Sequence, residues 1–83
     1  MKKLGFIGCG NMAGAIIGGI ISSGLLKKEE IIAAEIMEAA RKNAESKFGI
    51  EVTADNKQVA AESEIIVLAV KPQFYVEVIE EIR

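Results

Sequence analysis

Short apolar runs alternate with longer segments of helical pattern along this chain. Four runs have the length of buried β-strands, and they lie at residues 4–7, 31–36, 50–53 and 65–70. The segments between and after them predict helices at residues 11–23, 38–48, 55–61 and 72–82. The chain is therefore expected to alternate strand and helix four times.

Residues that begin or end helices stand where this pattern needs them. Asn11 is a candidate N-cap for the first helix, and residues 55–56 are candidate caps for the third. Gly24 and Gly49 are placed as left-handed stops, and Pro72 suits the first turn of the last helix. These signals agree with the bounds that the hydrophobic pattern predicts.

Strands separated by helices imply right-handed crossovers and a parallel sheet. The predicted fold is α/β, a Rossmann-type sheet with helices on both faces and the strand order 3-2-1-4. Residues 65–70 are apolar at every position, which is typical of an interior strand, yet this strand would have one edge unpaired. We expect an incomplete half of a fold, an N-terminal piece of a longer protein.

The turn after the first expected strand carries the pattern G-x-G-x-x-A. Its residues are Gly8, Cys9, Gly10, Asn11, Met12 and Ala13. The first glycine permits a tight turn, the second lets the backbone come close to a pyrophosphate, and the small sixth residue lets the helix lie close to the strand. Free N–H groups and the helix dipole would then face the anion. Although glycines also mark ordinary turns, the position between strand and helix predicts a dinucleotide site.

A membrane or secretion signal is the alternative for this region. Lys2 and Lys3 are followed by no charged residue until Lys27, and Gly10, Gly14 and Gly18 have the spacing of a helix-dimer motif. However, the glycines near residue 10 leave only about fourteen residues of helical pattern, which suits a buried helix better. In a water-soluble fold the same glycines would let the first helix pack tightly on a sheet.

Composition removes several classes of function. The 83 residues carry a net charge of -2 with a pI near 5.1. The Lys and Arg residues are scattered along the chain, so the sequence has no basic cluster of the kind that binds nucleic acid. One cysteine and no histidine exclude a disulfide framework and a Cys/His zinc site within the chain, and suit a reducing cytosol. We expect no metal site, and we interpret Cys9 as a small residue filling a turn.

Glu35 stands at the end of the second expected strand, about 20 residues beyond the fingerprint, where an acid commonly accepts hydrogen bonds from the adenosine ribose. A solvated carboxylate at a strand end is the other interpretation. If Glu35 faces the ribose, its charge opposes a 2′-phosphate and favours NAD over NADP, unless Arg41 or Lys42 supplies compensating charge.

Several stretches together resemble the N-terminus of pyrroline-5-carboxylate reductase. They are residues 6–13, residues 48–50, Asn56 and, above all, the run A-V-K-P-Q at residues 69–73. The resemblance extends over the whole chain, but only about the first third of such a reductase. It implies that residues 8–13 hold the pyrophosphate and that Ala34, Glu35 and Ile36 border the adenosine ribose.

The resemblance also assigns the far end of the cofactor. Asn56 would hydrogen-bond it, and the stretch beneath the nicotinamide-side ribose would be Ala69, Val70, Lys71 and Pro72. Lys71 is equally interpreted as a solvated lysine at a strand end. Family members often prefer NADPH and commonly carry a neutral residue where Glu35 stands, so the implied cofactor is NADP(H) or NAD(H).

By the same resemblance, the reaction is the reduction of 1-pyrroline-5-carboxylate to L-proline in the cytoplasm by a homo-oligomer. No catalytic residue is assigned here, because the family's helical substrate and dimerisation domain would follow these 83 residues, and the piece alone is expected to be inactive. The alternatives are the cofactor domain of another small-substrate dehydrogenase, a non-catalytic nucleotide-binding or redox-sensing module, and, less well matched, an S-adenosylmethionine site.

Overall fold

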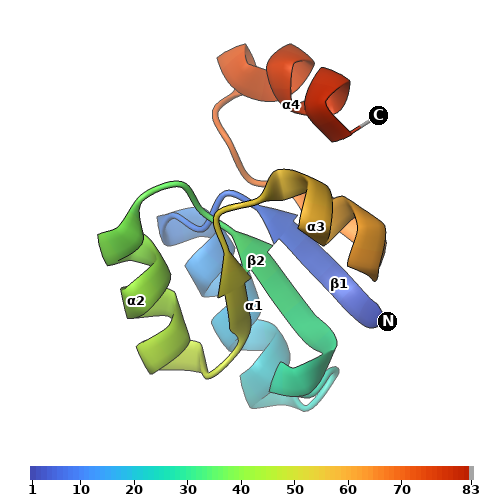
Figure 1. Ribbon diagram of the computed structural model, residues 1–83. Helices are drawn as coiled ribbons and strands as arrows, with labels where there is room; N and C mark the ends of the chain where they lie inside the picture. Colours follow the sequence, from blue (N-terminus) through green and yellow to red (C-terminus); the bar gives the residue numbers. More distant parts are fainter. Residues whose placement is uncertain (83) are drawn as a thin grey trace.

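One parallel sheet organises the protein in the computed structural model, which describes residues 1–82 (Figure 1). Its strands are β1 (Lys2–Ile7), β2 (Ile31–Ala34), β3 (Glu51–Thr53) and β4 (Ser63–Leu68), in the order β3-β2-β1-β4. All three pairings are parallel, so the carboxyl ends of the strands meet at one edge. The predicted Rossmann-type sheet and its order are confirmed.

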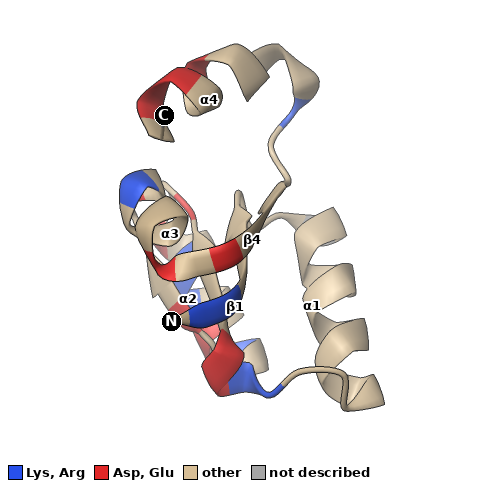
Figure 2. Cartoon of the chain, turned by 90° about the vertical axis from the view of Figure 1, so that its right-hand side faces the viewer, with Lys and Arg blue, Asp and Glu red and all other residues tan. Residues whose placement is uncertain are grey.

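Helices cover both faces of this sheet. In the described part of the chain they are α1 (Asn11–Ser23), α2 (Glu38–Phe48), α3 (Asn56–Glu62) and α4 (Tyr75–Ile82), with short 3-10 helices at η1 (Lys28–Glu30) and η2 (Pro72–Phe74). Side chains of α1 and α2 pack on one face, and those of α3 pack on the other, where Val78 of α4 joins the same cluster. Figure 1 shows α4 beyond the carboxyl ends of the strands. Figure 2 shows α1 and α3 on opposite sides of β1 and β4.

All four residues of β2 are apolar, without the alternation of apolar and polar residues that a half-exposed strand shows. Ile31 and Ala33 pack toward α1 and α2, whereas Ile32 and Ala34 pack toward α3 and α4. All four side chains are fully buried. Because successive strand residues point to opposite faces, a strand covered on both sides needs apolar residues at every position.

Two helix starts differ from expectation. Gly10, not Asn11, is the N-cap of α1, because Gly10 keeps an extended backbone (φ -92°, ψ -162°) and Asn11 is already helical. The last helical segment begins at Pro72 as expected, but its first turn is the 3-10 helix η2, and α4 follows from Tyr75. The left-handed stops at Gly24 and Gly49, and the cap at Asp55, are confirmed.

The expected bounds of the first, second and fourth strands are also wrong by two residues. β1 begins at Lys2 and not at residue 4. β2 ends at Ala34, before Glu35. The register of β4 is set by β1, since Lys2 lies opposite Ser63 and Ile7 lies opposite Leu68. Ala69 and Val70 therefore follow the strand, although Ala69 still donates its N–H to the Ile7 carbonyl oxygen at 2.8 Å.

The glycines of α1 serve a different contact from the expected one. A Cβ at Gly14 would lie 3.5 Å from Phe48 Cζ, and one at Gly18 would lie 3.4 Å from Phe48 Cε1. These glycines therefore let the ring of Phe48 on α2 approach α1, whereas Ala13 and Ile17 make the contact with the sheet side of the core. The expectation that Gly14 and Gly18 pack on the sheet is wrong.

The outer edge of β4 is open within residues 1–82, where β4 pairs with β1 alone. Ile65 in this strand is 62% exposed. No helix in the described part of the chain has the length and apolar character needed to cross a membrane.

Candidate functional site

The loop after β1 makes a turn that only glycine fits at its first position. Gly8 has a φ of +94°, which side chains of L-residues rarely adopt. A Cβ there would lie 3.0 Å from the Ala69 carbonyl oxygen and 3.0 Å from Val70 Cγ1. The Gly8 N–H donates to the Ala34 carbonyl oxygen at 2.8 Å, so the turn is fixed against both neighbouring strands.

Gly10 leaves an open space at the start of α1. No heavy atom lies within 4 Å of the position that its Cβ would take. As N-cap it has no side chain to accept hydrogen bonds from the first helical N–H groups, and no acidic side chain stands in the described first turn. A 13-residue helix therefore directs free N–H groups and the positive end of its dipole into open space, which is the arrangement that binds an anion.

The first turn of α1 has a buried side chain and an exposed one. Ala13 is 1% exposed and lies in the core, as the fingerprint predicts for its small sixth residue, whereas Met12 is 61% exposed. Cys9 is also buried in the core cluster with Phe6 and Ala13. Burial, and secondarily the charge of Glu35, raises the pKa of the Cys9 thiol. The thiol therefore stays protonated and packs as a small apolar group.

Glu35, the first residue after β2, joins two loops at the carboxyl edge. The Cys9 N–H donates to Glu35 Oε1 at 3.1 Å, and the Met37 N–H donates to Glu35 Oε2 at 3.0 Å. The Glu35 N–H itself donates to the Thr53 carbonyl oxygen at 2.8 Å. Because an ionised carboxylate has about four acceptor positions, each oxygen keeps capacity for a further donor such as a ribose hydroxyl.

The cations that could neutralise Glu35 are engaged elsewhere. Nη1 of Arg41 donates to the carbonyl oxygens of Glu35 at 2.8 Å and Ile36 at 2.7 Å, so the guanidinium braces the backbone of the β2–α2 loop. Lys42 pairs with Glu38 one helical turn away, at 3.0 Å. Among the described residues, no ion pair joins the Glu35 carboxylate to a cation.

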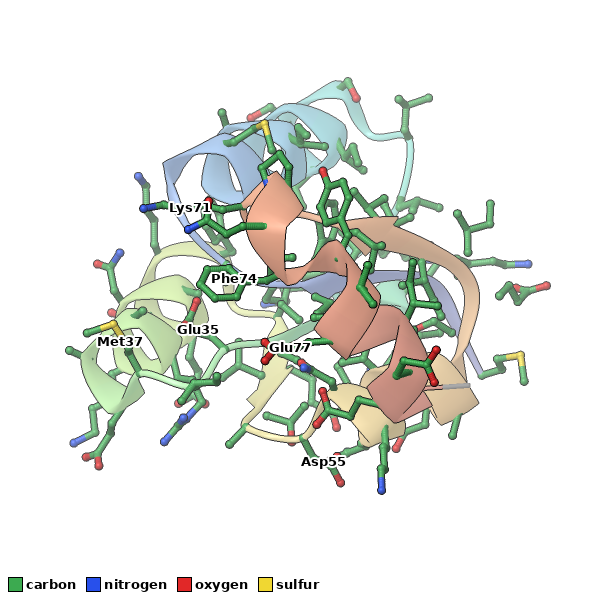
Figure 3. The ribbon with its side chains drawn as sticks, turned by 90° about the horizontal axis from the view of Figure 1, so that it is seen from above. Glu35, Met37, Asp55, Lys71, Phe74 and Glu77 are labelled. Carbon is green, nitrogen blue, oxygen red and sulfur yellow. The ribbon has the colours of Figure 1, made fainter. Side chains whose placement is uncertain are left out.

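The stretch after β4 reaches the same edge from the other side of β1. Ala69 and Val70 lie against Gly8, and Lys71, which is exposed, precedes η2. Seen from above, Lys71, Phe74 and Glu35 lie along one side of this edge (Figure 3). The structure thus brings the glycine loop, Glu35 and residues 69–72 together.

Asn56 does not join this group in the structure. Its side-chain amide donates to Glu81 Oε1 on α4 at 2.8 Å. Its contact with a cofactor stays a prediction, for which the second N–H and the Oδ1 of the amide have capacity.

Sequence reasoning missed two residues at this edge. Met37 acts through its backbone N–H, for which no sequence signal exists. Phe74 has a half-exposed ring. Its position two residues after Pro72, next to the residues assigned to the site, is the sequence feature that could have pointed to it. Within residues 1–82, no group of three or more His, Cys, Asp or Glu side chains is arranged to hold a metal ion.

Comparison with known proteins identifies the family of this chain. Residues 3–83 match the family described as "NADP oxidoreductase coenzyme F420-dependent". The chain belongs to this family. It is 39% identical over 82 residues to the pyrroline-5-carboxylate reductase of Methanosarcina acetivorans, covering 99% of this chain and 30% of that protein. With the enzyme of Escherichia coli it shares 40% identity over 81 residues, covering 98% of this chain and 30% of that protein.

Solved structures give the same comparison in three dimensions. A pyrroline-5-carboxylate reductase from Coxiella burnetii superposes with a TM-score of 0.90 at 35% identity, covering 96% of this chain and 29% of that chain. The reductase of Plasmodium falciparum with NADP bound superposes with a TM-score of 0.81 at 30% identity, covering 98% of this chain and 28% of that chain. The resemblance found in the sequence is confirmed, and the chain spans about 30% of the length of the curated relatives that it matches.

Proposed function

We propose that this chain is the cofactor-binding part of an NAD(P)H-dependent reductase that converts 1-pyrroline-5-carboxylate to L-proline. The observation that carries the proposal is the open helix start at Gly10, held at the carboxyl edge of a sheet that superposes on two such reductases. In open α/β sheets, ligands bind beyond the carboxyl ends of the strands.

The described residues fit a dinucleotide. The open space at Gly10 and the uncapped N–H groups of α1 suit a pyrophosphate, and the remaining acceptor positions of Glu35 suit ribose hydroxyls. Residues 8–13 would hold the pyrophosphate, residues 34–36 would border the adenosine ribose, and Asn56 with residues 69–72 would take the nicotinamide side. Lys71 contributes there through its backbone.

A cofactor bound here would supply, through its nicotinamide, the hydride for the carbon of the substrate C=N bond, and a proton on the nitrogen would complete the amine. Since such an imine, once protonated, is already a good hydride acceptor, the protein has mainly to align two rings and exclude water. The part played by this chain is to bind and orient the cofactor. In the complete protein, a helical C-terminal domain binds the substrate and forms a homo-oligomer in the cytoplasm.

The test is an assay of the complete protein with NADPH or NADH and 1-pyrroline-5-carboxylate, in which cofactor absorbance is followed and L-proline is identified by chromatography. Oxidation of the cofactor with formation of proline supports the proposal. Cofactor binding without oxidation would make the protein a nucleotide-binding module, and oxidation only with other small substrates would make it another dehydrogenase. The 83-residue chain alone is expected to give no turnover.

A further inference from the structure

The Glu35 carboxylate has a fixed position at the edge where the cofactor is proposed to bind. Backbone N–H groups of the glycine loop and of the β2–α2 loop each donate to one of its oxygens, at 3.1 Å from Cys9 and 3.0 Å from Met37. Its own backbone is held by Thr53 of β3. A carboxylate bound on two sides does not swing away from a ligand as a free surface glutamate does.

No cation in the described part of the chain forms an ion pair with this carboxylate. Arg41 is turned to two backbone carbonyl oxygens on the same loop, and Lys42 is paired with Glu38. Lys71 lies on the same side of the edge as Glu35 (Figure 3), but within the described residues 1–82 it forms no ion pair with the Glu35 carboxylate. The next turn along the carboxyl edge leads into α3. It carries one negative side chain, Asp55, and one positive side chain, Lys57, so it adds no net charge.

We propose that Glu35 makes this protein select NADH against NADPH, although the name of its family and one of its solved relatives refer to NADP. The inference rests on the proposed function, because it assumes that the adenosine ribose lies beside Glu35. The two cofactors differ only by the 2′-phosphate, which carries nearly two negative charges. Even at the dielectric constant of water, a carboxylate about 5 Å away weakens binding of such a group by about tenfold.

The experiment compares binding of NADH and NADPH to the complete protein by fluorescence titration, which needs no turnover. The wild type is expected to bind NADH at least about tenfold more tightly. Glu35→Gln removes the charge and should bring the ratio of the two dissociation constants close to one. Since the Gln amide accepts only one of the two N–H groups that Glu35 accepts, the variant weakens the loop for both cofactors, and the ratio cancels this effect.

Glu45→Gln is the matched control. It removes the same charge from an exposed position on α2, and Glu45 forms no ion pair among the described residues, so the variant releases no cation near Glu35. This variant should keep the wild-type ratio. Raised ionic strength should reduce the ratio more for the wild type and for Glu45→Gln than for Glu35→Gln, because screening weakens the repulsion between the Glu35 carboxylate and the 2′-phosphate.

The inference is overturned if the wild type binds NADPH as tightly as NADH, or more tightly. It is also overturned if the ratio of the two dissociation constants is unchanged in Glu35→Gln, or if this ratio changes equally in both variants. None of these results touches the proposed function, which fails separately if the protein binds NADH but does not reduce 1-pyrroline-5-carboxylate. If the folded protein binds neither cofactor, both are overturned.

Discussion

Gly8 and Gly10 stand two residues apart in one loop, yet the structure predicts opposite effects of alanine at the two positions. Gly8 has a φ of +94°, and its Cβ would meet the backbone at Ala69. Gly10 has an extended backbone that alanine adopts without strain, and its Cβ would meet nothing. Gly8→Ala should therefore damage the fold, and Gly10→Ala should damage cofactor binding alone.

The size of each effect follows from the local geometry. At Gly8, the strained backbone costs about 1–3 kcal/mol, and the two contacts at 3.0 Å, of which the Ala69 oxygen cannot move aside, add about 1–3 kcal/mol. The sum, about 2–6 kcal/mol, is a large fraction of the total free energy of unfolding of a domain, about 5–15 kcal/mol. At Gly10, alanine should change the free energy of unfolding by less than about 1 kcal/mol.

Two assays on the complete protein separate these effects. Urea denaturation followed by far-UV circular dichroism should show a midpoint clearly lowered for Gly8→Ala and unchanged for Gly10→Ala. Titration with NADH should show affinity at least about tenfold weaker for Gly10→Ala, because the methyl group takes the space left for the pyrophosphate. Wild-type stability of Gly8→Ala, or wild-type affinity of Gly10→Ala, would refute this reasoning.

Two further predictions concern the stability of the fold. A Cβ at Gly5 would collide with Ser63 Oγ and lie 2.6 Å from Val59 Cγ1, so Gly5→Ala should destabilise the protein by about 1–3 kcal/mol. Gly19 has an open position inside α1, so Gly19→Ala should stabilise the protein by about 1 kcal/mol. Urea denaturation that ranks the two variants the other way contradicts both predictions. The pKa of the Cys9 thiol is raised, so its contribution to stability is complete below the ordinary thiol value of 9.0 and is lost as pH rises through the folded-state pKa. Stability should therefore fall more steeply above about pH 9 in the wild type than in Cys9→Ala, and parallel pH profiles would speak against a buried neutral thiol.

The strand and helix sequence, the strand order and the glycine turn were all predictable from the pattern of residues. Local chemistry is sufficient for them. Left-handed stops need glycine at residues 24 and 49, a strand buried on both faces needs an unbroken apolar run such as that of β2, and alternation of strand with helix implies a parallel sheet. The position of Glu35 near the site was predictable for the same reason, since it follows β2 directly.

Only the tertiary structure decided how these parts meet. The register against β1 places β4 two residues earlier than the apolar run predicts. Gly14 and Gly18 make room for the ring of Phe48, a contact that the hydrophobic periodicity of α1 does not predict. The sequence likewise does not predict the partners of Glu35, because every residue except proline has a backbone N–H group. Only in the folded chain do the N–H groups of Cys9 and Met37 both donate to this one carboxylate. Sequence thus determined which elements form, since that depends on neighbours along the chain. Structure determined which groups face each other, since that depends on distances across it.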